Sequence, residues 1–336
     1  MRSIILIMVL ITATLTGCGV VKDTEVPSGA FPGEYYQVTD DKGNVLEFNK
    51  KPTRIYATTL SIEEILVDLV PLNRIVAISE PAADTKISLI ADKAAHISVK
   101  LPQKASTEKI LSLKPDLVIV QENSNAAFIQ SLKDVGLKVY ITKVPTTVKM
   151  VRSRIINLAA AVGEKQQGGK IINELDNKTE TVKKVIGQIP KSEKKILMAY
   201  SLLGVFGSAE GLFHDICISA GVTNGAALAG LVRGEHLSKE KIVEVIVFLC
   251  LSILTIEVDP DILMFSDYSS TQEGDSELFR KEVLDDPALQ SIKAIKNKNI
   301  IIIKDRYRYA ASQYIGDAIC DIAQKTYPEY FDQINN

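Results

Sequence analysis

One phrase occurs twice in this chain and constrains its fold more than any other feature. The first copy reads STEKILSLKPDLVIV at 106–120, and the second begins with SKEKIVEV at 238–245 and closes on VDPDILMF at 258–265. In each copy a serine in N-cap position opens a helical stretch, and Pro-Asp ends it before a buried apolar run. The sequence therefore predicts two lobes that each contain the same helix–strand unit.

Strand-like runs alternate with helical stretches through both halves of the chain, which is typical of a parallel sheet with helices on both faces. The runs lie at 54–58, 74–79, 116–121, 138–143, 195–200, 261–265 and 299–304. A further pair of short alternating runs around Gly43-Asn44 predicts a hairpin over 38–48. Strand–helix alternation on this scale predicts an α/β protein.

A helical region separates the two halves. From 146 to 186 the apolar residues recur at helical spacing, and Gly163 and Gly168-Gly169 interrupt them, so the region forms either two helices or one long bent helix. We therefore expect an N-terminal α/β lobe over 36–146, a helical connection over 147–186 and a C-terminal α/β lobe over 187–336.

The first residues predict export and a lipid anchor. Arg2 precedes a short apolar stretch at 4–15, as in a signal peptide. Leu15-Thr16-Gly17-Cys18 resembles a bacterial lipobox, in which the cysteine is lipidated; the alternative is a plain secretory signal with an accidental cysteine. We expect a signal peptide over 1–17, lipid on Cys18 and a flexible tether over 18–35. The folded part would then lie at the extracytoplasmic face of the cell membrane.

Composition and spacing argue against several function classes. The net charge is −2 with both signs interspersed, which gives no support for nucleic-acid binding. Cys217, Cys250 and Cys320 lie far apart, and the three histidines lack the spacing of a zinc or manganese site. No nucleophile motif, phosphate-binding loop or dinucleotide fingerprint is present. We expect a monomeric protein that is not an enzyme and holds no intrinsic cofactor or metal.

The order of these features resembles the substrate-binding lipoproteins of ABC importers for iron-siderophores, haem and cobalamin. The resemblance covers 54–330 and rests on the Arg54-Ile55 strand start, both repeated units and the helical connection. It implies the two-lobed periplasmic-binding-protein fold with a helical connection, known as class III. It also implies that Glu108 and Glu240 dock onto arginines of an ABC permease dimer, which works with an ATPase.

The cargo implied by the resemblance is a metal chelate, either a ferric siderophore or haem, with cobalamin as the alternative. Ligands of parallel α/β sheets bind where the strands end, and Arg233 lies in a segment that enters the cleft in the resembling family. An Arg-Tyr cluster after the last strand suits anionic, partly aromatic chelates. His236 is a candidate axial ligand only if the cargo is haem. The candidate ligand-binding residues are Thr58, Thr59, Glu80, Gln121, Asn123, Ser201, Phe206, Arg233, Asp267, Tyr268, Arg306, Tyr307, Arg308 and Tyr309.

The second copy of the phrase departs from the first. Glu240 lies thirteen residues farther from its Pro-Asp than Glu108 does, because an apolar run at about 245–257 is inserted. The run is too short to cross a bilayer, so it either packs into the core or forms a contact surface. An extracytoplasmic hydrolase and a sensory or structural lipoprotein remain alternatives from other functional classes.

Overall fold

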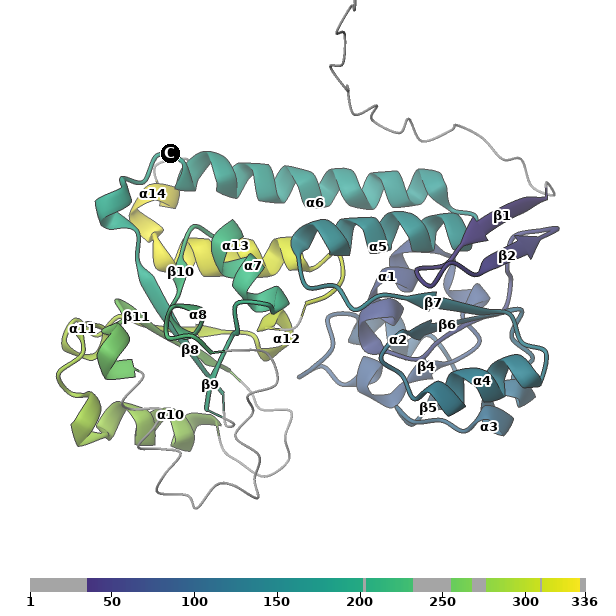
Figure 1. Ribbon diagram of the computed structural model, residues 1–336, viewed down its shortest axis with the longest axis horizontal. Coiled ribbons are helices and arrows are strands. Elements are labelled where there is room, and N and C mark those ends of the chain that lie inside the picture. Colours follow the sequence, from purple (N-terminus) through teal and green to yellow (C-terminus); the bar gives the residue numbers. More distant parts are fainter. Residues whose placement is uncertain (1–34, 202–203, 232–254, 268–275, 309, 333–336) are drawn as a thin grey trace, which may run out of the picture.

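The computed structural model describes residues 35–201, 204–231, 255–267, 276–308 and 310–332. It shows two α/β lobes side by side beneath a pair of long helices (Figure 1). The elements of the N-terminal lobe are β1 Tyr36–Thr39, β2 Val45–Phe48, β3 Ile55–Ala57, α1 Leu60–Leu69, η1 Leu72–Arg74, β4 Ile78–Ser79, η2 Glu80–Ala83, α2 Ala91–Ala95, β5 Lys100–Leu101, α3 Thr107–Ser112, β6 Leu117–Gln121, α4 Ala126–Asp134 and β7 Val139–Thr142.

The long helices are α5 Val148–Ala161 and α6 Lys165–Ile186. The C-terminal lobe follows them. Its described elements are η3 Lys191–Glu193, β8 Ile196–Ser201, β9 Gly204–Phe206, α7 Leu212–Ser219, β10 Thr223–Asn224, α8 Gly225–Leu228, β11 Ile262–Ser266, α10 Ser276–Asp285, η5 Pro287–Leu289, α11 Lys293–Lys296, β12 Ile300–Ile303, α12 Asp305–Arg308, α13 Ile315–Thr326 and α14 Pro328–Asp332.

Each lobe is built on parallel strands that are buried on both faces. In the N-terminal lobe β3, β6 and β7 pair in that order, and in the C-terminal lobe β10, β8, β11 and β12 pair in that order, with β9 antiparallel to β8. Successive side chains along β6 alternate between the main core (Leu117, Ile119) and a separate cluster under α3 and α4 (Val118, Val120). Alternation between two apolar environments explains why these strands read as continuous apolar runs.

The two repeated phrases build the same three-strand arrangement. Ile55 of β3 pairs with Leu117, and Val118 pairs with Val139 of β7. In the other lobe Leu197 of β8 pairs with Ile262, and Leu263 pairs with Ile300 of β12. The register is therefore identical when the two Pro-Asp units are superimposed in sequence, and the predicted α/β fold class is confirmed.

The aspartate of each Pro-Asp unit explains how the register is fixed. Asp116 accepts hydrogen bonds from the backbone N–H groups of Thr53 (2.8 Å) and Arg54 (2.9 Å), just before β3. Asp261 accepts one from the N–H of Ile196 at 2.8 Å, at the start of β8. A carboxylate that holds the first N–H groups of the neighbouring strand aligns the two strands before their ladders begin.

Two segments, the run at 74–79 and the inserted run, differ in detail from what the sequence predicted. The run at 74–79 forms a strand only at Ile78–Ser79, since Arg74 ends η1 and Ile75 makes only an isolated bridge to Ile55. Of the inserted run, residues 245–254 lie outside the described part of the chain, and residues 255–258 are helical. Thr255 is buried and shares a hydrogen bond with the hydroxyl of Tyr200 in β8. The end of the insertion thus forms a helical turn shortly before β11.

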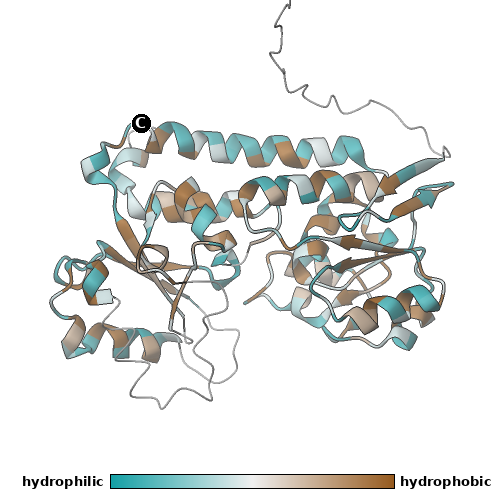
Figure 2. Ribbon diagram, viewed as in Figure 1, coloured by the Kyte–Doolittle hydropathy of each residue, from teal (hydrophilic) through white to brown (hydrophobic). Residues whose placement is uncertain are grey.

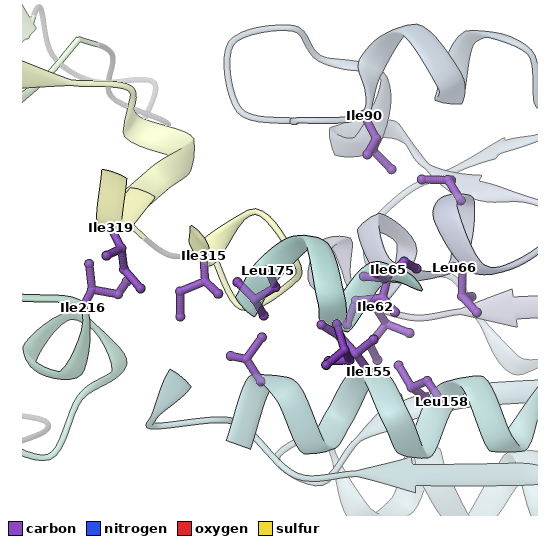
Figure 3. Close-up of a cluster of buried hydrophobic side chains, with 14 of the residues drawn as sticks. Ile62, Ile65, Leu66, Ile90, Ile155, Leu158, Leu175, Ile216, Ile315 and Ile319 are labelled. Carbon is purple, nitrogen blue, oxygen red and sulfur yellow. The ribbon is translucent and has the colours of Figure 1, made fainter. Parts of the chain in front are cut away.

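The glycine-interrupted region forms two helices, and α6 spans both lobes (Figure 1). Its 22 residues correspond to about 33 Å of helix. A continuous apolar core runs beneath it, from Ile62 and Ile155 through Leu175 to Ile216 and Ile319 (Figure 3). Because one core and one helix serve both lobes, large hinge motions between them would require this packing to break.

Figure 2 shows the apolar residues concentrated in the strands and the inner helices, while much of α6 is hydrophilic. The buried positions of α6 include Ile171, Leu175 and Val182, at helical spacing along one face. Within the described residues, no helix has both the length and the apolar character needed to cross a bilayer. The long helix therefore lies with one face on the core and the other toward solvent.

Two adjacent glycines of α6 give a matched test of this helix packing. A Cβ at Gly168 would lie 2.4 Å from the Cβ of Ala159 in α5, whereas a Cβ at Gly169 would meet nothing within 4 Å. Both variants to alanine gain helix propensity, worth about 1 kcal/mol, but only Gly168→Ala must push the helices apart, at about 1–3 kcal/mol. Urea unfolding should show Gly169→Ala more stable than wild type and Gly168→Ala less stable. Equal stabilities would contradict the close helix approach.

Candidate functional site

The carboxyl end of the C-terminal sheet carries a charged cluster on α12. Arg308 Nη2 lies 3.0 Å from Asp305 Oδ1, and both side chains are buried. The Asp305 N–H donates to Asp267 Oδ1 at 2.8 Å, and the Arg308 guanidinium lies 5.0 Å from the ring centroid of Phe206. Burial raises the pKa of Asp305, and the positive charge of Arg308 opposes this shift. The sequence placed Arg308 as an open anion contact, but its charge is engaged inside the lobe.

Arg306, on the same short helix, lies between the two lobes. Its Nη1 donates to the backbone carbonyls of Thr85 (3.2 Å) and Ser88 (3.0 Å), which follow β4 in the N-terminal lobe. Tyr307 is half-buried and packs against the main core, and Lys304 Nζ lies 5.5 Å from the centroid of its ring. The structure thus brings the strand ends after β12 and after β4 into direct contact.

The N-terminal lobe contributes polar groups at its strand ends. Thr58 and Thr59 follow β3, and both hydroxyl oxygens are buried without a hydrogen-bond partner among the described residues. Gln121 is the last residue of β6 and is half-buried, whereas Asn123 and Glu80 are exposed. Thr58, Thr59, Gln121 and Asn123 follow or end strands of the β3-β6-β7 sheet, whereas Glu80 follows β4 of the separate β4-β5 pair.

The remaining predicted ligand-binding residue that the structure describes is Ser201. Ser201 ends β8, and its hydroxyl donates to the carbonyl of Gly204 at 3.3 Å. The residues outside the described part of the chain are Cys18, Arg233, His236, Glu240, Tyr268 and Tyr309. Among the described residues, no group of three or more His, Cys, Asp or Glu side chains could hold a metal ion.

Glu108 lies in the first turn of α3 and is fully exposed. Ser106 caps this helix, and its hydroxyl accepts a hydrogen bond from the N–H of Lys109 at 3.3 Å. A hydrogen bond with the Ser106 side chain holds the pKa of Glu108 below its ordinary value. Glu108 is thus an ionised carboxylate that projects from a capped helix, as the first copy of the phrase predicts.

The structure also shows a buried polar junction between the lobes that sequence reasoning missed. Glu64 Oε2 of α1 accepts a hydrogen bond from Ser312 Oγ of the C-terminal lobe at 2.6 Å, and the Glu64 carbonyl accepts from Gln313 Nε2 at 2.7 Å. Arg154 of α5, which is 2% exposed, donates to Ser61 Oγ and to the Ala311 carbonyl. We call this set the inter-lobe junction. The only sequence signal was a pair of glutamates inside the apolar stretch SIEEILVDLV at 61–70.

Burial determines the electrostatics of α1 at this junction. It raises the pKa of Glu64 to about 7, although the hydrogen bond from Ser312 and the Arg154 charge oppose the shift. It likewise raises the pKa of Glu63 to about 7, although Glu63 accepts bonds of 2.6 Å from both the N–H and the hydroxyl of Ser79. Burial also lowers the pKa of Arg154 to about 10.

Comparison with known proteins now places the chain. Residues 55–307, which include both repeated units, match the family model described as periplasmic binding protein. The chain belongs to the periplasmic binding protein family. One relative is the uncharacterized ABC transporter substrate-binding lipoprotein YvrC of Bacillus subtilis (strain 168). It is 25% identical over 193 residues, or 56% of this chain. That match spans 60% of the relative's own length.

Solved structures share the fold of this periplasmic binding protein. The haem-binding protein RhuT from Roseiflexus sp. RS-1, in apo form, has a TM-score of 0.66 at 21% identity, covering 82% of this chain and 98% of RhuT. A possible iron-binding, periplasmic solute-binding protein from Staphylococcus epidermidis ATCC 12228 has a TM-score of 0.63 at 20% identity, covering 83% of this chain and all of that one. The expected family and two-lobed fold class are both confirmed.

Proposed function

We propose that this protein is an extracytoplasmic, lipid-anchored substrate-binding protein that delivers an anionic metal chelate to an ABC importer. The observation that carries the proposal is the contact between the strand ends of the two lobes, which the cationic side chain of Arg306 makes. The family model matches the chain across both of these lobes. A ferric siderophore or haem is the proposed cargo, and cobalamin is the alternative. The names of similar proteins, which include a haem-binding and a possible iron-binding protein, support this cargo class.

The proposed binding residues are those at the strand ends, with the unpartnered hydroxyls of Thr58 and Thr59 as the most specific candidates. A buried hydroxyl without a hydrogen-bond partner costs about 1–3 kcal/mol of stability. A ligand that forms hydrogen bonds with these hydroxyls would offset this cost. Of the arginines, Arg306 is the one that we assign to the cargo, because Arg308 is paired with Asp305. The proposed anchor remains Cys18, and the proposed docking residues remain Glu108 and Glu240.

A titration with absorbing chelates tests the proposal. The chain has 11 tyrosines and no tryptophan, so its ultraviolet fluorescence comes from tyrosine and should be quenched when a coloured chelate binds between the lobes. We expect saturable quenching by haemin or by one of a panel of ferric siderophores, and weaker quenching by cyanocobalamin. Tight binding of cyanocobalamin alone would select the alternative cargo.

A double variant links the titration to the proposed site. Thr58→Val and Thr59→Val together keep the side-chain shape but remove both hydroxyls, so we expect about tenfold weaker chelate binding without loss of stability. Thr181→Val, at an exposed position of α6, is the control and should bind like wild type. No quenching by any chelate would favour a sensory, structural or hydrolytic role instead.

A further inference from the structure

The segment from α12 to the start of α13 contacts the N-terminal lobe in two chemically different ways. At its inner end Ser312 and Gln313 bond to α1 in the inter-lobe junction, where Ser312 and Glu64 are both buried. At its outer end Arg306 donates to the backbone carbonyls of Thr85 and Ser88. The inner contact joins buried polar side chains, whereas the outer contact joins the Arg306 guanidinium to two backbone carbonyls.

The acceptors of Arg306 are neutral. Both are backbone carbonyls, and among the described residues no carboxylate lies within 4.0 Å of its guanidinium. In contrast, neighbouring Arg308 is neutralised by Asp305 at 3.0 Å. A guanidinium bonds a carboxylate or another anion about twice as strongly as a neutral group, so an anion that reached Arg306 would displace the carbonyls.

The loop that Arg306 holds is also tied to the inter-lobe junction. Glu64 accepts a hydrogen bond from Ser312 Oγ, and the backbone N–H of Leu89, the residue after Ser88, lowers the pKa of the same carboxyl group. Within the loop the N–H of Ser88 donates to the carbonyl of Asp84 at 2.9 Å. Loss of the Arg306 bonds would therefore loosen the outer part of the loop, while Leu89 at its inner end stays beside Glu64.

We propose that Arg306 is a positioning residue that exchanges partners: it holds residues 85–88 against the C-terminal lobe until an anionic group of the cargo takes its guanidinium. This inference rests on the proposed function and deepens it, because it assigns a cause for a cargo-dependent change at the lobe boundary. The inter-lobe junction stays intact in both states, so the change is confined to the loop after η2. A neutral cargo would leave the loop in place.

Hydrogen exchange followed by mass spectrometry on the full-length protein tests the contact without any cargo. We expect the amides of 85–88 to exchange about tenfold faster in Arg306→Gln than in wild type, because their opening no longer breaks two charge-assisted bonds. Lys304→Gln is the matched control, since it removes a nearby positive charge that contacts Tyr307 rather than the other lobe. Equal exchange in Arg306→Gln and wild type would overturn the proposal.

A second arm tests the exchange of partners, with haemin and ferric citrate as anionic probes and a neutral ferric trihydroxamate as a probe without an anionic group. We expect saturating anionic probe to raise exchange at 85–88 in wild type to the level of Arg306→Gln, and the neutral trihydroxamate to leave it unchanged. Bound probe without this rise would overturn the exchange while leaving the proposed function standing. If no probe binds, the proposed function and the exchange of partners both fail. Faster exchange in Arg306→Gln would in that case still confirm the Arg306 contact.

Discussion

The protein should lose stability as the pH rises from 5 to 8. Glu63 and Glu64 both have their pKa raised to about 7 by burial in α1, so the folded protein holds these two protons more tightly than the unfolded chain does. Their contribution to stability is complete below the unfolded pKa of about 4.3 and is lost as the pH approaches the folded value. Each pKa unit corresponds to about 1.4 kcal/mol, so each carboxyl group accounts for roughly 3 kcal/mol.

Urea unfolding at a series of pH values measures this effect. Glu64→Gln keeps an acceptor for Ser312 and should remove about half of the slope between pH 5 and 8, and Glu63→Gln should remove a similar part. The double variant should be nearly flat in this window and more stable than wild type at pH 8. Because total stability is typically about 5–15 kcal/mol, the change is large enough to shift the unfolding midpoint clearly.

Other charged groups also shift the pKa values of Glu63 and Glu64, so the pH series needs a control variant. Arg154 from α5 lowers the pKa of Glu64, whereas Asp68 on α1 raises it, and Glu64 raises that of Glu63. Glu174→Gln, at an exposed position of α6, is the control and should leave the slope unchanged. A slope identical in wild type and in the double variant would show that both glutamates ionise as freely in the folded protein as in the unfolded chain.

The repeated units were predictable because their signals are local. A serine N-cap, a glutamate in the first turn and a Pro-Asp stop act over fewer than twelve residues, and Ser106, Glu108 and Asp116 occupy the expected places. The short strands β9 and β10 were not predicted, because Gly204–Phe206 and Thr223–Asn224 carry no periodic pattern and are strands only by pairing with β8.

The candidate site was predictable by position and less so by chemistry. The rule that ligands bind at strand ends selected Thr58, Arg306 and Arg308, but it could not assign a partner to either arginine. Those partners, Asp305 for one and the carbonyls of Thr85 and Ser88 for the other, depend on tertiary packing. The role of the buried glutamates of α1 was not predictable for the same reason, since the glutamate pair within 61–70 did not indicate that Ser312 would bond to Glu64.

Loss of the Glu108 carboxylate should abolish most cargo uptake while cargo binding stays intact. Glu108 is exposed at the start of a capped helix, and within the described residues it forms no ion pair, so its charge is available to a cationic partner. The resemblance assigns that partner to arginines of the permease. Removing one close charge pair from an interface typically costs at least about 1.4 kcal/mol, or tenfold in affinity.

Uptake of labelled cargo by cells that express the permease would measure this effect. We expect at least about a tenfold reduction for Glu108→Ala, with an unchanged titration of the purified variant. Glu174→Ala removes the same charge from α6, which lies on another side of the molecule from α3 (Figure 1), and should transport like wild type. The docking should also weaken as salt rises, because exposed charge pairs are screened over about 8–10 Å at ordinary ionic strength. Normal uptake by Glu108→Ala would exclude docking through this carboxylate, since neither the fold nor the cargo site depends on it.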